Sequence, residues 1–237
     1  MKSLTAALAT VLLTATPLAA QAQSGNLAVD AQANIFGYGV GTPAPGGGGG
    51  GVLAPVIALN AGTGRTITFA ASGIAGWGGS LNNGPDGGLF SGSTQIPAVG
   101  PISGYSGPLS GFLVGVFIEA GDISGLAAPG GLSYAGTADY AQASYAPNLR
   151  QVFFIGDGLT GTGAGAPQVF HIPDGAGALV LGIADAYGFN AAAGYYYDNV
   201  GSFDVMYQAV PEPASSALFG LGAAALIAAA ARRRRKG

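Results

Sequence analysis

Short runs in which hydrophobic and polar residues alternate recur through the middle of the chain, separated by glycine, proline, asparagine or aspartate. Alternation with a period of two is typical of a half-buried β-strand, because successive side chains point to opposite faces. It is clearest at 65–71, 178–184 and 202–208. The pattern predicts eight strands, at 27–35, 52–59, 65–71, 111–118, 151–155, 168–172, 178–184 and 202–208.

No long amphipathic helical stretch is found between the two ends of the chain. The alanine-rich segment 134–146 is followed at once by Pro147, so we expect a loop or one short helix there. Eight short strands joined by long Gly-rich loops predict an all-β fold. The expected architecture is an antiparallel β-sandwich of the jelly-roll kind, with two sheets packed face to face.

Composition refines this expectation. The 44 glycines could indicate disorder, but 49% of the residues are hydrophobic and the glycines separate recognisable strands, which favours a folded, loop-rich domain. The chain has no cysteine. Disulfides, zinc–thiolate sites and cysteine nucleophiles are therefore excluded.

The amino-terminal end has the pattern of a secretory signal peptide. Lys2 provides a positive start, 4–18 is an apolar run, and Ala20-Gln21-Ala22 is a small-x-small cleavage site. We expect residues 1–22 to be removed, so that the mature protein begins at Gln23. Residues 23–209 then form one domain.

The carboxyl-terminal end, 210–237, contains three features in order: a rigid Pro-Glu-Pro turn, a small apolar run at 214–231, and a basic cluster. The apolar run has 18 residues, which as a helix reach about 27 Å, just short of a ~30 Å hydrocarbon core. It predicts a marginal transmembrane helix whose basic end stays in the cytoplasm. The turn and the cluster consist of Pro211, Glu212, Pro213, Arg232, Arg233, Arg234, Arg235 and Lys236.

This end resembles the PEP-CTERM sorting signal of Gram-negative bacteria. The resemblance implies an exported protein that passes through an inner-membrane intermediate, with exosortase as its partner. Its destination is then the cell envelope or the extracellular space. The alternative is an ordinary carboxyl-terminal anchor.

The domain between the two ends is acidic. Residues 23–209 contain two arginines and ten acidic residues, which gives a net charge of −8. A surface of this sign repels phosphate backbones, so nucleic acid is not an expected partner. The charge is compatible with Ca²⁺ binding.

Candidate chemistry lies around the loop between the last two predicted strands. Asp185 ends one strand, and Asp198 with Asn199 precedes the next, so adjacent antiparallel strands could bring the three side chains together. Two carboxylates and an amide oxygen suit Ca²⁺, whose affinity at extracellular sites is about 10⁻⁴ to 10⁻³ M. The alternative is that these residues only form turns, which is the preferred interpretation for Asp86, Asp157 and Asp174.

Several segments resemble the galactophilic, calcium-dependent bacterial lectin family: 62–69, 75–77, 84–87, 179–185 and 198–205. The resemblance implies a small β-sandwich in which Ca²⁺ bridges protein and sugar hydroxyls. The implied metal ligands are Asp185, Asp198, Asn199, the carbonyl of Ser80 and one in the loop at Phe189 or Asn190. The chain departs from the family in two ways. Residues 89–151 are an insertion relative to the family, and the family's sugar-contacting His and Gln have no counterpart that can be placed.

Aromatic residues add a carbohydrate-binding hypothesis. Trp77, together with Asp185 and Asn199, is the expected sugar site. The tyrosine row 195–197 could stack on sugar rings, or alternate members could plug the edge of the sandwich.

An enzyme is not expected. The single histidine, His171, lies within a predicted strand and favours a structural role, and no nucleophile elbow is found. Glu119 with Asp122 or Asp139 leaves a glycoside hydrolase as a weaker alternative. The sequence thus predicts an exported, non-catalytic protein that binds an extracellular polysaccharide or glycan with Ca²⁺. The main alternative is a structural component of the envelope or of the biofilm exopolysaccharide matrix.

Overall fold

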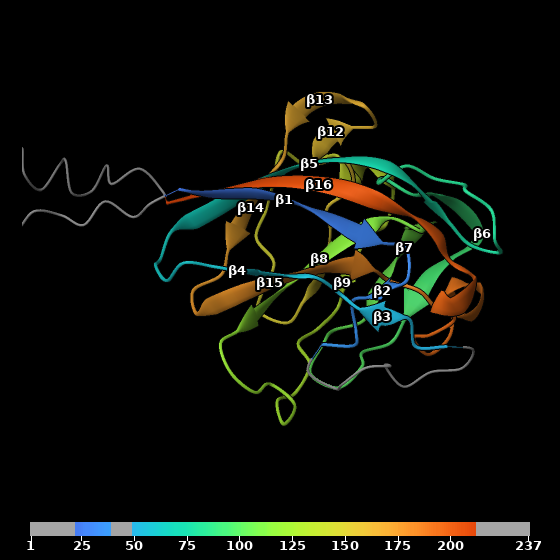
Figure 1. The fold of residues 1–237 in the computed structure, drawn as a ribbon, viewed down its shortest axis with the longest axis horizontal. Coiled ribbons are helices and arrows are strands. Elements are labelled where there is room, and N and C mark those ends of the chain that lie inside the picture. The colour runs from blue at the N-terminus through green and yellow to red at the C-terminus, as the bar shows by residue number, and fades with distance from the viewer. Residues whose placement is uncertain (1–21, 39–48, 212–237) are drawn as a thin grey trace, which may run out of the picture.

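The computed structural model describes residues 22–38 and 49–211 (Figure 1). This part of the chain is mostly β-strand, so the all-β prediction is confirmed. The strands are β1 Gln23–Asp30, β2 Ala33–Asn34, β3 Val52–Leu53, β4 Val56–Ala58, β5 Arg65–Gly76, β6 Gly88–Ile96, β7 Tyr105–Ser110, β8 Leu113–Glu119, β9 Leu132–Ser133, β10 Ser144–Tyr145, β11 Val152–Phe154, β12 Leu159–Gly161, β13 Ala164–Pro167, β14 Val169–Ile172, β15 Ala176–Ile183 and β16 Val200–Pro211. Three short 3-10 helices are found in the same residues, η1 Thr137–Tyr140, η2 Tyr187–Phe189 and η3 Tyr196–Asp198.

The expected targeting segments are not described. The signal peptide at 1–22, except for its last residue, and the apolar run at 214–231 lie outside the described residues. Within residues 22–38 and 49–211, no helix has the length and apolar character needed to cross a membrane.

The first large sheet has the strand order β1-β16-β5-β14-β10. In this sheet β16 pairs antiparallel with β5 along its whole length and with the edge strand β1 over residues 202–209. At about 3.3 Å per residue, β16 spans roughly 36 Å. Gln23 lies opposite Ala209, so the start of β1 and the end of β16 lie side by side at the left of Figure 1.

The second large sheet has the order β11-β8-β15-β2-β3, and β4 also pairs with β15. Its strands β8 and β15 are buried along most of their length. Figure 1 shows β1, β16 and β5 above β15 and β4. The buried side chains of the two sheets belong to one hydrophobic core, in which Phe153 of β11 and Phe170 of β14 have ring centroids 5.5 Å apart.

Two predicted strands are interrupted. The strand expected at 27–35 ends at Asp30, because the Asp30 carboxylate accepts a hydrogen bond from the Gln32 amide (2.8 Å) and forms a turn. The chain then continues as β2. The strand expected at 52–59 is divided into β3 and β4 at Pro55, which has no N–H to donate to a ladder.

The region 89–151, expected as an insertion, contributes a sheet of its own, but it also supplies β8 and β10 to the two large sheets and is therefore part of the main fold. The order of its own sheet is β6-β7-β9, and β6 begins just before the region. The expectation of a loop or short helix at 134–146 is confirmed by η1.

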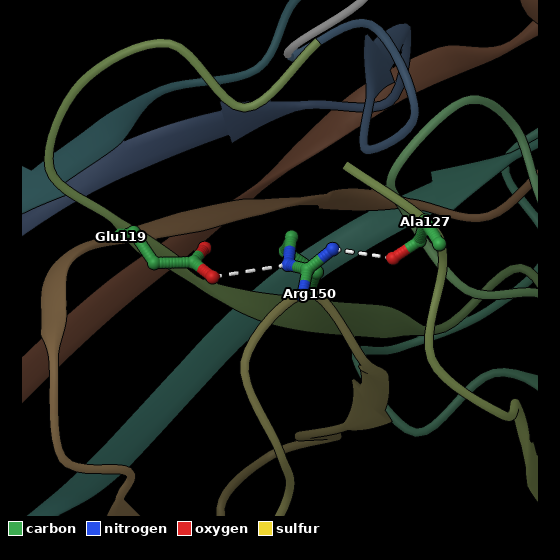
Figure 2. A network of polar contacts seen from close by, with 3 residues as sticks. All are labelled: Glu119, Ala127 and Arg150. Atoms are coloured by element: carbon green, nitrogen blue, oxygen red, sulfur yellow. Dashed lines mark hydrogen bonds and ion pairs between the residues drawn. The ribbon is translucent and has the colours of Figure 1, made fainter. Parts of the chain in front are cut away.

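The segment after β8 is held by Arg150 (Figure 2). The Arg150 Nε donates to Glu119 Oε1 at 3.1 Å, and its Nη1 donates to the carbonyl oxygen of Ala127. One guanidinium therefore links the end of β8 to the loop that follows it.

Candidate functional site

The loop between β15 and β16 carries the candidate residues, and its two ends meet. Asp185 follows β15, Asn199 precedes β16, and the Asn199 Nδ2 donates to Asp185 Oδ2 at 2.9 Å. The same Nδ2 donates to the carbonyl of Ala31 at 2.9 Å, and the Ala186 amide donates to Asp185 Oδ1 at 2.7 Å. Both side chains are buried. The structure thus brings Asp185 and Asn199 together, in contact with the turn between β1 and β2.

A buried tyrosine hydroxyl holds the backbone beside this pair. Tyr196 is fully buried, accepts a hydrogen bond from the Asp185 amide (3.2 Å) and donates one to the carbonyl of Ile183 (2.7 Å). Burial raises the pKa of the Tyr196 phenol, and the nearby Asp185 adds to the shift. The phenol therefore stays neutral and serves as a structural bridge.

Asp185 itself has a strongly altered acidity. Burial raises its pKa to about 7, the hydrogen bonds from Ala186 and Asn199 oppose the shift, and the nearby Asp198 adds to it. A carboxyl of this kind changes charge near neutral pH.

Most of the other expected metal ligands make contacts of their own. The Asp198 Oδ2 accepts from the Gly78 amide (3.2 Å) and its carbonyl accepts from Gly79 (3.0 Å), which ties the loop to the end of β5. The Ser80 carbonyl packs against Gly76, where a Cβ would lie 2.0 Å from that oxygen. Asn190 is exposed and lines a different, open groove beside β7.

Trp77, Asp185 and Asn199 line one small cavity, of about 10 Å³. Phe189 closes it with its ring 5.0 Å from that of Trp77, edge to face. The volume is close to the ~10–15 Å³ that one water needs, so a sugar ring does not fit inside.

The arrangement does not fit a calcium ion. Ca²⁺ takes six to eight oxygen ligands, but the Asn199 nitrogen, and not its oxygen, faces the carboxylate. In residues 22–38 and 49–211, no group of three or more acidic or histidine side chains could hold a metal ion. Calcium binding at Asp185 stays a prediction that requires the amide to turn.

The same loop exposes an aromatic surface that the sequence predicts only in part. Tyr196 is buried, whereas Tyr195 is half-buried and Tyr197 is 61% exposed. Tyr187, which the sequence analysis missed, is 65% exposed, and its ring centroid lies 4.9 Å from that of Tyr195. The Tyr195 and Tyr197 centroids are 5.7 Å apart. Tyr187, Tyr195 and Tyr197 are called the tyrosine platform below.

The tyrosine platform is held in place by an unusual backbone. Tyr195 has a φ of 73°, in the left-handed region that non-glycine residues rarely adopt. The fully buried Tyr196 follows directly and fixes the loop. The signal that could have found Tyr187 was its position at the start of the same loop as the tyrosine row.

The remaining acidic residues make local structural contacts. Asp157 accepts from the Leu159 and Gly163 amides, and Asp122 accepts from the Ser124 amide. Asp139 accepts from Ala135 and Gly136 at the start of η1. Glu119 pairs with Arg150, and His171 is an exposed residue of β14 paired with Thr66. A glycosidase pair among Glu119, Asp122 and Asp139 gains no support from these contacts.

Comparison with known proteins bears on the carboxyl-terminal end. Residues 209–235 match the family described as the PEP-CTERM protein-sorting motif. No curated protein matches the chain, and nothing in the comparisons supports the lectin resemblance. The motif implies a protein that is exported, processed by exosortase and sorted through the membrane to the cell surface. Its first three matched residues form the end of β16.

Proposed function

We propose that this protein is a non-catalytic surface protein whose β-sandwich domain binds a neutral extracellular glycan through the tyrosine platform. The observation that carries the proposal is a row of three tyrosine rings on one exposed loop, in which Tyr195 contacts both Tyr187 and Tyr197. Exposed aromatic faces suit the apolar side of a pyranose ring. The packing of Trp77 against Phe189 beside the small cavity then has a supporting role, because it holds the start of the loop in place.

The negative charge of the domain favours a neutral glycan over an acidic one. The domain has a net charge of −8, and Asp198 adjoins Tyr197 in the loop. An acidic polysaccharide would meet like charge at this surface, and like charges across an interface disfavour binding. A neutral polysaccharide avoids this repulsion.

We expect Tyr197→Ala and Tyr187→Ala each to weaken binding to a neutral polysaccharide at least tenfold. Stacking of a nucleic-acid base on an aromatic side chain contributes about 1–3 kcal/mol, and we expect a similar scale for a sugar ring here. Affinity electrophoresis of the purified protein in gels containing laminarin, dextran or galactan measures the effect. Tyr197→Phe keeps the ring and should retain binding.

Met206→Ala is the matched control, since Met206 is 60% exposed on β16 and lies outside the tyrosine platform. Equal retardation of Tyr197→Ala and wild type would contradict the proposal. If none of the three polysaccharides retards the wild-type protein, the result would favour a structural component of the envelope or matrix.

Calcium enters the proposal as a separate ligand. Ca²⁺ at Asp185 requires the Asn199 amide to turn and to give up its hydrogen bond with Ala31. If that happens, millimolar Ca²⁺ raises the melting temperature of wild type and leaves Asp185→Asn unchanged. If melting temperatures do not respond in either protein, the pair is a purely structural hydrogen bond and the tyrosine platform acts without a metal.

A further inference from the structure

A second concavity lies away from the tyrosine platform, between the β12–β13 hairpin, η1 and the turn before β6. Its volume is about 170 Å³. This is far above the ~10–15 Å³ of one water and below the ~300–1,000 Å³ of pockets for drug-sized ligands, so the space suits a single ring. Polar and aromatic side chains line it, among them Asp86, Thr137, Tyr140, Phe154, Thr160 and Thr162. We call it the Asp86 pocket.

The walls of the Asp86 pocket are fixed by hydrogen bonds. The Asp157 carboxylate accepts from the amides of Leu159 and Gly163 and so holds the hairpin that carries the two threonines. Tyr140 accepts a hydrogen bond from the Tyr105 hydroxyl at 2.7 Å, and its ring stacks on Tyr134 with centroids 4.5 Å apart. A preformed wall loses little freedom when a ligand binds.

The pocket also contains a negative charge without a basic partner. Asp86 Oδ1 accepts from the Asp157 amide at 2.8 Å, and Thr162 hydrogen-bonds the same carboxyl. The ion pair found in the part of the chain that the structure describes is Glu119–Arg150, which does not involve Asp86. Burial raises the pKa of Asp86, and the nearby Asp157 adds to the shift.

The ionised Asp86 carboxylate is destabilised, because the hydrogen bonds from Asp157 and Thr162 only partly offset the loss of water on burial and no cation neutralises the charge. A bound cation would remove this penalty. The threonine hydroxyls can donate to and accept from ligand hydroxyls, while Tyr140 and Phe154 offer apolar ring surface.

We propose that the Asp86 pocket binds a single polyhydroxylated ring that carries a protonated amine, with the amine on the Asp86 carboxylate and the hydroxyls toward Thr137, Thr160 and Thr162. The chemical class is that of an amino sugar. This site is separate from the tyrosine platform and does not depend on it.

The test compares three probes of one ring size, glucosamine, glucose and N-acetylglucosamine, by isothermal titration calorimetry of the full chain in detergent at pH 7. A charge-assisted hydrogen bond is roughly twice as strong as a neutral one. We therefore expect glucosamine to bind at least tenfold more tightly than the two neutral sugars. Asp86→Asn keeps an acceptor for the Asp157 amide and removes the charge, so it should reduce the preference to less than about threefold.

Two further variants complete the design. Asp122→Asn removes an exposed carboxylate elsewhere and should keep the full preference for glucosamine. Thr137→Trp places a bulky ring at an exposed lining residue and should weaken all three probes, which tests the site even if Asp86→Asn does not fold. Equal affinity for glucosamine and glucose, no saturable binding, or an unchanged preference in Asp86→Asn overturns the proposal. Tyr197→Ala should leave glucosamine binding unchanged, so failure of the tyrosine platform and failure of the Asp86 pocket are distinguishable.

Discussion

Phe170→Ala is expected to lower the free energy of unfolding by about 3–5 kcal/mol, the range for removing a buried aromatic side chain from a core. Phe170 is fully buried in β14. Its ring packs against three others. The ring centroids are 5.2 Å apart for Phe69 of the same sheet, 5.3 Å for Tyr145 and 5.5 Å for Phe153 of the other large sheet. The substitution therefore removes contacts within one sheet and between the two sheets at the same time.

Urea denaturation followed by fluorescence measures this loss, with Met206→Ala as an exposed control that should change the free energy of unfolding by less than about 0.5 kcal/mol. The double variant Phe153→Ala/Phe170→Ala adds a test of the contact between the sheets. Because the two rings touch, their effects should not add, and a coupling of about 0.5–1.5 kcal/mol is expected. A loss below 1 kcal/mol for Phe170→Ala would mean that the two sheets do not share this core.

The second large effect concerns pH. Asp185 has a folded-state pKa of about 7 against an ordinary value of 3.8, because burial disfavours its charged form. Between these two values the folded protein binds more protons than the unfolded chain, so its stability falls as the pH rises from about 4 to about 7. Above about 7 the fall is complete. At 1.36 kcal/mol per pKa unit, the full loss is about 4 kcal/mol.

Asp185→Asn cannot ionise and should lack this part of the pH dependence. We expect the stability difference between pH 4.5 and pH 8 to be about 3 kcal/mol smaller in the variant than in wild type. Urea unfolding at both pH values, with EDTA present to exclude metal binding, measures it. Asp204→Asn, at an exposed position of β16, is the matched control and should follow wild type. Parallel pH profiles of Asp185→Asn and wild type would show that the Asp185 carboxyl does not titrate as described.

The strands that the sequence predicts well are those with strong alternation and a buried face. The strand predicted at 202–208 is the middle of β16, and that at 178–184 corresponds to β15. In both, one set of alternate residues is apolar enough to stand out from its neighbours. The pattern depends on local order alone, so it can be seen without the fold.

The strands β6 and β7 could not be predicted in this way. β7 contains Gly107 and Pro108, which usually argue against a strand. The structure gives the reason for the glycine, since a Cβ there would lie 2.2 Å from the Tyr140 hydroxyl. The packed rings of Tyr105, Tyr134 and Tyr140 require this space, and that requirement is visible only after the chain has folded.

The candidate site shows the same division. Asp185 and Asn199 could be placed together from the sequence because they flank one loop between two strands. The orientation of the Asn199 amide could not, because it depends on the carbonyl of Ala31, which is far away in sequence. This single hydrogen bond turns the nitrogen toward Asp185 and decides the chemistry of the pair.

If the protein is anchored through its carboxyl-terminal end and binds a ligand at the tyrosine platform, as proposed, the position of β16 has a mechanical consequence. The tyrosine platform lies just before the start of β16, and the sorting motif begins at its end, so tension between ligand and attachment point runs along this strand. β16 is paired with β5 over its full length and with β1 over residues 202–209. Because both points of pull lie at the two ends of one strand that is already extended, the covalent backbone of β16 carries the tension, and the ladders to β1 and β5 are not put under load.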